Sequence, residues 1–118
     1  MKVIDTSLKD ARIFVADALE DHRGLFKETY RKSVWAEAGI DVDFVQDNIS
    51  RSTKGVLRGL HYDFNVTKLI QVIRGRTFHV IADMRPESPT YLKWQSFILS
   101  HENHKLVYVP AGFANGFY

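Results

Sequence analysis

The 118-residue sequence contains no cysteine. This absence excludes a disulfide framework, a cysteine-ligated zinc site and a cysteine nucleophile. Long apolar runs are also missing, because none approaches the roughly 18 residues that a membrane-spanning helix needs. The N-terminal stretch MKVIDTSLKD has no apolar region of the kind that marks a signal peptide. The sequence therefore predicts a cytoplasmic protein with no membrane partner.

A strong surplus of either charge is absent as well. The 16 basic and 14 acidic side chains give a net charge of +2, whereas nucleic-acid-binding domains usually carry a strongly basic surface. Hydrophobic residues make up 45% of the sequence and charged residues 25%, which is ordinary for a folded globular protein. We expect residues 1–118 to form a single domain that does not bind nucleic acid.

The sequence is rich in β-branched and aromatic residues, with turn residues recurring roughly every eight to twelve positions, a pattern typical of an all-β sandwich or barrel. One short helix is expected, with Ser33 as its N-cap, VWAEA as its body and Gly39 as its C-terminal stop. The strands that we expect span residues 12–16, 25–30, 44–52, 56–63, 68–73, 77–84, 93–100 and 105–110.

Glycine-containing stretches mark the expected connections. Arg74-Gly75-Arg76 predicts the turn of a hairpin, and AGFANGF, residues 111–117, predicts a loop after the last strand. A jelly roll needs about eight strands to close its edges. Because Tyr118 follows the loop directly, we expect a jelly roll that is shortened at its C-terminus. Its exposed apolar edge would favour a tight dimer or a larger assembly.

A cationic cluster with one histidine lies within GVLRGLHYDFNVTKLIQVIRGR, residues 55–76. Strict alternation would place Arg58 and His61 on opposite faces of a strand, but Gly59 is a candidate bulge because glycine inside a strand often marks one. If both side chains point inward, they supply a fixed cation beside a group that titrates near neutrality. This combination suits an anionic substrate that must lose a proton. The simpler alternative is a structural or exposed histidine.

Lys68 and Asp83 have two interpretations each. Lys68 is either a solvated charge beside a strand or an ammonium that stabilises a developing enolate oxygen. Alternation places Asp83 on the face opposite Phe78 and Val80. There it is either exposed to solvent or orients His61.

A metal site is not expected from the histidine spacing. Small β-barrels often bind metal through a His-x-His pair, but the sequence has His61-Tyr62-Asp63 at that place. A later Pro-x-Gly-x-x-His would supply another ligand, and PAGFAN has Asn115 instead. Neutral imidazoles are the usual ligands of zinc or iron, and asparagine is a poor substitute.

Several of these stretches together resemble one family. RGLFKE, QDNIS, KGVLRGLHY, SPTYLKW and VPAGFANGF occur in the order and approximate spacing found in the dTDP-4-dehydrorhamnose 3,5-epimerases, the RmlC-type cupins. The resemblance runs from about residue 11 to the end. It implies a cupin jelly roll, or double-stranded β-helix, that forms homodimers by exchanging N-terminal strands. It also implies nucleotide-diphosphate 4-keto-6-deoxy sugars as substrates, with no metal or organic cofactor.

The resemblance further implies roles for individual residues. His61 matches the family's catalytic base, Lys68 the lysine near the sugar ketone, and Arg58 the arginine that holds the diphosphate. Asp83 matches a pocket aspartate and is included among the catalytic candidates. The other implied substrate contacts are Arg23 and Glu28 from the partner subunit, Gln46 and Asn48 in the pocket wall, Phe26, and Asn115.

The implied chemistry suits these side chains. A C4 ketone acidifies the protons on C3 and C5, because the carbanion is delocalised as an enolate. A neutral histidine removes a proton from one face, an acid returns one to the other face, and a positioned cation stabilises the enolate. A bidentate arginine anchors the diphosphate and so holds the sugar in the reactive pose. The predicted function is therefore an epimerase that inverts C3, C5 or both.

Three departures from the family pattern leave alternatives open. Asn115 replaces the histidine of the usual GFAHGF loop, as in some relatives that act on GDP-linked 6-deoxy-4-keto-heptoses. The loop between His61 and Lys68 is shorter than in the rhamnose-pathway enzymes. The family's tyrosine acid matches neither Tyr62 nor Tyr118 and falls beyond the last residue. The alternatives are a GDP-linked substrate, a catalytically incomplete cupin that binds nucleotide sugars or serves as a dimeric interaction module, and, more remotely, a metal-dependent cupin.

Overall fold

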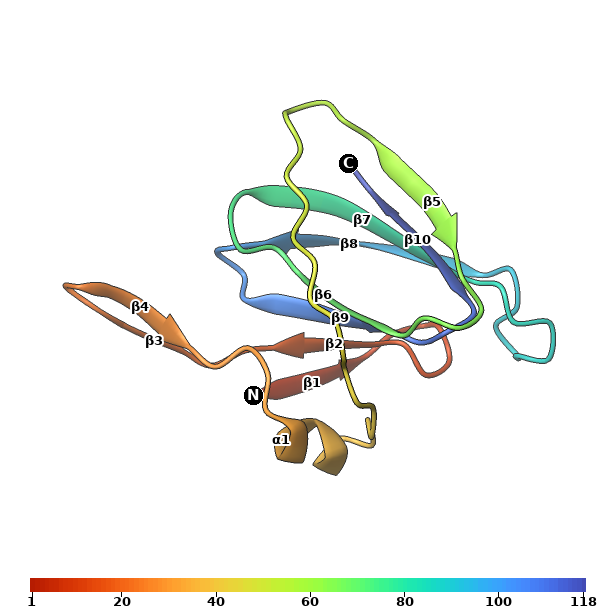
Figure 1. The fold of residues 1–118 in the computed structure, drawn as a ribbon, viewed down its shortest axis with the longest axis horizontal. Helices are drawn as coiled ribbons and strands as arrows, with labels where there is room; N and C mark the ends of the chain where they lie inside the picture. The colour runs from red at the N-terminus through yellow and green to blue at the C-terminus, as the bar shows by residue number, and fades with distance from the viewer.

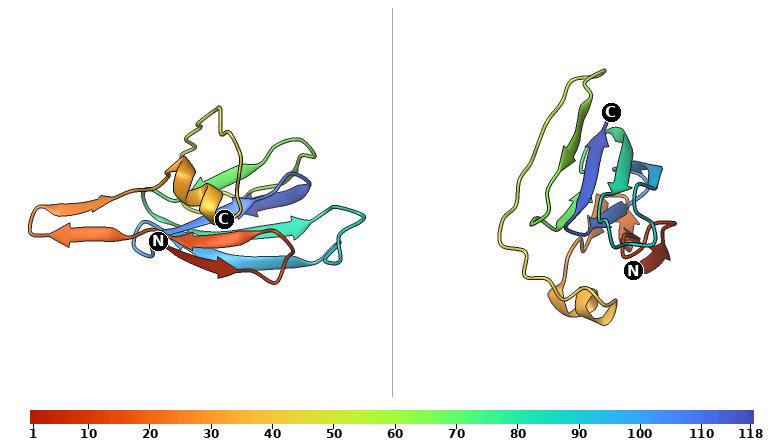
Figure 2. Two further views of the ribbon diagram at one scale, coloured as in Figure 1. Left: turned by 90° about the horizontal axis from the view of Figure 1, so that it is seen from below. Right: turned by 90° about the vertical axis from the view of Figure 1, so that its right-hand side faces the viewer.

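Two four-stranded antiparallel sheets face each other in the computed structural model, which describes residues 1–118 (Figure 1). The all-β prediction is therefore confirmed. The first sheet contains, in spatial order, β1 (Lys2–Asp5), β2 (Arg12–Val15), β9 (Lys105–Val109) and β6 (Lys68–Gln71). The second contains β5 (Arg58–Tyr62), β10 (Phe113–Phe117), β7 (Arg76–Asp83) and β8 (Trp94–Ser100). A separate hairpin of β3 (Ala18–Asp21) and β4 (Gly24–Lys27) projects from one end of this sandwich (Figure 2).

The main hydrophobic core fills the space between the two sheets. Strand alternation explains its composition, because successive side chains point to opposite faces of a sheet. The first sheet contributes the buried residues Ile13, Val107 and Val109, and the second contributes Ile81 and Leu99. Odd-numbered residues of β7 and β8 therefore face inward.

A second hydrophobic cluster lies on the outer face of the first sheet, beneath the helix α1 (Lys32–Glu37). Trp35 of this helix packs against Phe14 of β2, with 3.8 Å between the ring centroids, and both side chains are buried. Leu106 of β9 belongs to the same cluster. The helix therefore covers the face of the first sheet that points away from the second sheet.

The predicted helix is confirmed, but only one of its predicted ends is. Gly39 ends it with a φ of 87°, a conformation that glycine adopts readily. The prediction of Ser33 as N-cap is wrong, because Arg31 occupies that position and no side chain caps the first turn. The helix therefore begins at Lys32, before the serine whose hydroxyl indicated an N-cap. The structure contains no helix with the length and apolar character needed to cross a membrane.

Residues 113–117 form β10 rather than the predicted loop. This strand pairs with β5 on one side and β7 on the other, so it lies inside the second sheet. The sequence pattern concealed it because Ala114 and Gly116 lack the β-branched side chains that indicate a strand. Small residues instead let neighbouring backbones approach, and Gly116 lies directly against Gly59 of β5.

Residues 44–52, predicted as a strand, pair with no other strand. The segment runs from the helix to β5 across the front of the sandwich (Figure 1). An ion pair between Lys32 and Asp43 anchors its start, whereas Val45 and Ile49 are 91% and 83% exposed. The sequence pattern indicates extended backbone, but a strand also needs a neighbour whose backbone groups it can bond.

The predicted hairpin at Arg74-Gly75-Arg76 is also wrong. β6 belongs to the first sheet and β7 to the second, so this turn carries the chain from one sheet to the other. Gly75 has a φ of 89°, which accounts for the turn signal in the sequence. Such a signal fixes a change of chain direction, while the pairing of the flanking strands depends on the remaining strands of both sheets.

Candidate active site

A bulge in β5 places Arg58 and His61 on the same face of the second sheet. His61 lies opposite Asn115 of β10 and Arg58 lies opposite Phe117, so three steps along β5 match two steps along β10. Directly opposite residues share a face, and residues two apart in a strand share a face as well. The bulge predicted at Gly59 is therefore confirmed by the shift in register.

Glycine is required at this bulge for two reasons. Gly59 has a φ of 110°, which other residues rarely adopt. A Cβ built on it would lie 2.6 Å from the Gly116 Cα and 2.9 Å from the carbonyl oxygen of Asn115. A Cβ on Gly116 would in turn lie 2.8 Å from the carbonyl oxygen of Arg58. The two glycines thus allow the close approach of β5 and β10 that holds Arg58 and His61 on one face.

His61 begins a row of side chains that crosses the inner face of the second sheet. Asn115 is its neighbour in β10, and Ile81 follows in β7. Asn115 is 8% exposed and Ile81 is fully buried, whereas His61 is exposed because β5 is an edge strand. The imidazole can therefore reach a bound ligand while its neighbours in the row are held by the core.

Arg58 begins the adjacent row, which continues through Phe117, His79 and Phe97. The His79 imidazole stacks with both phenyl rings, at centroid separations of 5.5 Å from Phe97 and 5.7 Å from Phe117. His79 is 1% exposed, and its Nε2 atom has no hydrogen-bond partner. Burial lowers the pKa of His79 to about 4, so the imidazole is neutral near pH 7.

Lys68 faces the same interior from the first sheet. It begins β6 opposite Val109, which is buried in the core between the sheets. Ile70, two residues further on, also packs against that core, so alternation turns Lys68 inward. β5 and β6 are edge strands of the two sheets and follow each other in the chain. Lys68 and His61 therefore approach the interior from the same side of the sandwich.

Asp83 ends β7 and is fully buried, so the solvent-exposed alternative is wrong. Its carboxylate accepts hydrogen bonds of 2.5 to 3.0 Å from Arg85, Ser88 and Thr90. Burial alone would raise the pKa of this carboxyl, but the hydrogen bonds outweigh burial and hold the pKa well below its usual range. These bonds hold the loop after β7, and none of them reaches His61.

The hairpin carries Arg23 and Phe26 away from the sandwich, and Glu28 follows it directly (Figure 1). Arg23 forms its ion pair with Asp21 inside the hairpin, at 2.6 Å. Phe26 is 72% exposed. A single chain therefore does not bring these three predicted contacts to His61.

Gln46 and Asn48 lie on the extended segment in front of the sandwich. Both are exposed, and the Gln46 amide donates a 3.1 Å hydrogen bond to the Asn48 side-chain oxygen. Ser52, on the same segment, bonds the Arg58 guanidinium, a contact that the sequence analysis missed. Nothing in the sequence distinguishes Ser52 from the neighbouring hydroxyl residues. His79 was not predicted to belong to this site either, although alternation in β7 places it on the inner face.

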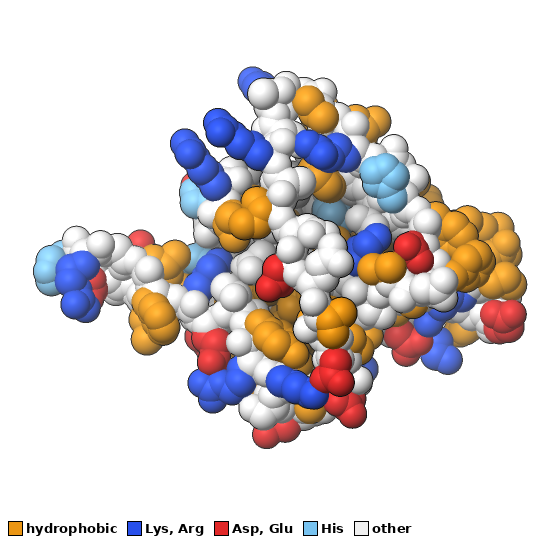
Figure 3. Space-filling view, viewed as in Figure 1, with side chains coloured by type: hydrophobic (Ala, Val, Ile, Leu, Met, Phe, Trp, Pro, Cys, Tyr) orange, Lys and Arg blue, Asp and Glu red, His pale blue; other side chains and the backbone are white.

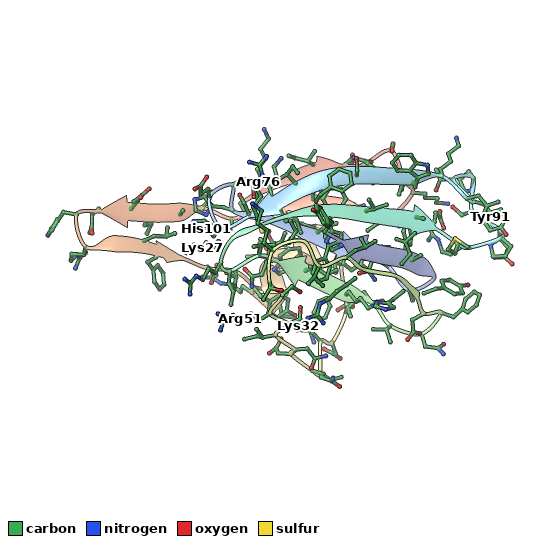
Figure 4. All side chains as sticks on the ribbon, turned by 90° about the horizontal axis from the view of Figure 1, so that it is seen from above. Lys27, Lys32, Arg51, Arg76, Tyr91 and His101 are labelled. Carbon is green, nitrogen blue, oxygen red and sulfur yellow. The ribbon has the colours of Figure 1, made fainter.

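Basic and acidic side chains both occur in the half of the molecule that carries the hairpin, and the basic ones gather in its upper part. Figure 3 shows several of them above the turn that joins β6 to β7. Figure 4 labels Lys27, Arg51 and Arg76 in this half and Tyr91 at the opposite end. Such a concentration of positive charge favours an anionic ligand. No group of three or more histidine, aspartate or glutamate side chains is spaced to hold a metal ion.

Comparison with known proteins gives a consistent match. The family model for dTDP-4-dehydrorhamnose 3,5-epimerase matches residues 5–118. The dTDP-4-dehydrorhamnose 3,5-epimerase of Shigella flexneri is 46% identical over 99% of this chain, and that of Methanothermobacter thermautotrophicus is 45% identical over 98%. The chain spans 67% and 64% of the length of these two relatives.

Solved structures share the arrangement of strands. The Bacillus anthracis epimerase with TDP and PPi bound has a TM-score of 0.92 and 45% identity, over 98% of this chain and 69% of that one. The Legionella pneumophila enzyme in complex with dTDP-4-keto-L-rhamnose has a TM-score of 0.94 and 43% identity, over 99% and 64%. The predicted cupin jelly roll is confirmed, and the chain belongs to the dTDP-4-dehydrorhamnose 3,5-epimerase family.

Proposed function

We propose that this chain acts on a nucleotide-diphosphate 4-keto-6-deoxy sugar and epimerises it at C3, C5 or both. The observation that carries the proposal is the bulge at Gly59, which turns Arg58 and His61 to one face of the second sheet. Lys68 faces the same interior from the first sheet. The interior between the sheets would thus hold a base together with two cations, one for the diphosphate and one for the enolate.

His61 acts as the base in this proposal. The neutral imidazole accepts a proton from C3 or C5 of the sugar, and the electron pair moves into the enolate formed with the C4 oxygen. The Lys68 ammonium stabilises the negative charge that develops on that oxygen. Arg58 binds the diphosphate, and this remote contact holds the sugar carbon against His61. A donor on the opposite face of the sugar, which we leave unassigned, completes inversion.

The proposed nucleotide is dTDP. Support comes from the relatives, since the Legionella pneumophila neighbour binds dTDP-4-keto-L-rhamnose and the Bacillus anthracis neighbour binds TDP. Asn115 lies directly opposite His61, where it would contact the sugar. Because the usual family residue there is histidine, a GDP-linked sugar remains the alternative substrate to test. Location in the cytoplasm stays a prediction from the sequence.

The proposed working unit is a homodimer. The hairpin has no neighbouring strand beyond its own two, and an isolated hairpin is marginally stable in water. Leu19 and Phe26 are 71% and 72% exposed, which leaves apolar surface for a second copy to cover. In such a dimer Arg23, Phe26 and Glu28 would reach the nucleotide in the partner's site. Gln46 and Asn48 would line the wall of their own pocket.

Deuterium exchange tests the proposal directly. The chain is incubated in D2O with dTDP- or GDP-linked 4-keto-6-deoxyglucose, and deuterium at C3 and C5 is followed by NMR. We expect incorporation with the wild-type chain and none above background with His61→Ala. His101→Ala, which removes a histidine from the turn after β8, serves as the matched control and should exchange normally. Equal exchange in His61→Ala and wild type would contradict the role of His61.

A further inference from the structure

The Arg58 guanidinium is held on one of its edges by the extended segment before β5. Its Nε–H donates a 2.8 Å hydrogen bond to the Ser52 hydroxyl oxygen, and Nη2 donates a 2.9 Å bond to the Arg51 carbonyl oxygen. Both acceptors belong to the segment that pairs with no strand. Arg58 therefore links that segment to the edge of the second sheet.

The position of these two bonds determines what the guanidinium can still bind. Nε and Nη2 form the side edge of the planar group, while Nη1 and the second hydrogen of Nη2 form its end. Ser52 and Arg51 occupy the side edge, so the end remains free. Two parallel N–H donors at the end suit the paired oxygens of a phosphate.

We propose that Ser52 is a positioning residue for substrate binding, which holds the Arg58 guanidinium so that its free end faces the diphosphate. The proposal rests on the proposed function, since it needs a diphosphate ligand. Arg58 is exposed on an edge strand, so without the hydroxyl its long side chain would sample many rotamers. Ser52 reduces this freedom before the ligand binds, and preorganisation of this kind increases the binding affinity.

Neighbouring hydroxyls provide the comparison that the test needs. Residues 50, 52 and 53 are serine, serine and threonine, and Ser52 is the one that bonds the guanidinium. Thr53 uses its backbone carbonyl to accept a bond from Val56, a contact that a change of side chain leaves in place. Thr53→Ala is therefore a matched control for loss of a hydroxyl from this segment.

The test measures binding of dTDP and GDP by titration calorimetry. Ser52→Ala is expected to weaken binding of the better nucleotide about tenfold, as loss of a hydrogen bond to a charged group does. Ser52→Thr keeps the hydroxyl and should bind within about twofold of wild type, as should Thr53→Ala. In exchange assays Ser52→Ala should raise KM more than it lowers kcat, because the base is untouched. Thermal unfolding of each variant checks that the fold is unchanged.

A double-mutant cycle separates positioning from direct contact with phosphate. If Ser52 acts through Arg58, Ser52→Ala added to Arg58→Ala should cause no further loss of affinity. A further tenfold loss in that background would mean that Ser52 binds the diphosphate itself and would overturn the proposal. Wild-type affinity in Ser52→Ala would overturn it too. Failure of the wild-type chain to bind either nucleotide would instead reject the proposed function.

Discussion

Gly59 and Gly116 face each other across β5 and β10 with no room for a side chain between them. A Cβ on Gly59 would lie 2.6 Å from the Gly116 Cα. Arg58 directly precedes the first glycine and Asn115 directly precedes the second. Any shift that relieves a clash between the strands therefore moves residues of the candidate active site.

Gly116→Ala tests this coupling. Overpacking at the contact should lower the free energy of unfolding by about 1–3 kcal/mol. Because displacement of a catalytic group by about 1 Å can cost a hundredfold in rate, deuterium exchange should fall by up to about that factor. Gly75→Ala is the control, since a Cβ there meets nothing within 4 Å and only the positive φ is strained. It should lose about 1 kcal/mol and keep its exchange rate. Unchanged stability and exchange in Gly116→Ala would contradict the coupling.

The stability of the fold should decrease as the pH falls from about 6.5 to about 4, because of His79. Burial favours its neutral form, so the unfolded chain binds a proton in this range and the folded chain does not. The shift from 6.5 to about 4 corresponds to about 3 kcal/mol at the acid end, with no effect above pH 7. Denaturant unfolding at several pH values measures it. His79→Phe, which preserves the stack with Phe97 and Phe117, should remove this part of the acid sensitivity.

Asp83→Asn should destabilise the chain strongly, by about 3–5 kcal/mol, since it breaks a buried ion pair with Arg85. Asp10 also pairs with Arg85 but is half exposed, so Asp10→Asn should cost less than about 1 kcal/mol. The pKa of Asp83 is lowered in the folded chain, so its contribution is present above pH 3.8 and is lost as the pH falls below it.

The same variant distinguishes a loop-holding role from an orienting one. If Asp83 only fixes the loop after β7, the pH dependence of deuterium exchange in Asp83→Asn should follow the wild type at a temperature where both are folded. A shift in the pH at which His61 becomes active would show that Asp83 acts on the base, which is the second of the two interpretations that the sequence left open for Asp83.

The chain should sediment as a dimer at micromolar concentration. Phe26→Asp places a charge on the exposed apolar face of the hairpin and should shift the equilibrium toward monomer, because the charge would have to be buried at the interface. Glu20→Gln, on the neighbouring strand β3, changes a charge without removing apolar surface and should leave the dimer intact. A stable wild-type monomer in analytical ultracentrifugation would contradict the prediction.

Local patterns in the sequence predicted the fold class and the approximate position of most strands. Alternation correctly placed Asp83 on the face opposite Phe78 and Val80, and Gly59 indicated the bulge that brings Arg58 and His61 to one face. These features are local, since each follows from residues within one strand. The family resemblance added candidate residues for the site, and the structure turns three of them, His61, Arg58 and Lys68, toward one interior.

Features that depend on distant partners could not be predicted in the same way. β10 is built from small residues whose strand character comes from the flanking strands β5 and β7. Residues 44–52 have the composition of a strand but lack a neighbour to pair with. The turn at Gly75 has the sequence of a hairpin turn, but the two strands that it joins lie in different sheets. Asp83 shows the same limit, because its partners Ser88 and Thr90 are set by the loop geometry.

β10 has a neighbouring strand on each side, whereas β5 has one on a single side. Backbone amides of β10 should therefore be among the slowest in the sheet to exchange with solvent, while those of β5 open through local fluctuations at low free-energy cost. His61 and Arg58 thus stand on an edge strand that opens readily, beside a strand with high protection. A ligand that contacts both strands would suppress this local opening, so its binding would be recorded as slower amide exchange along β5.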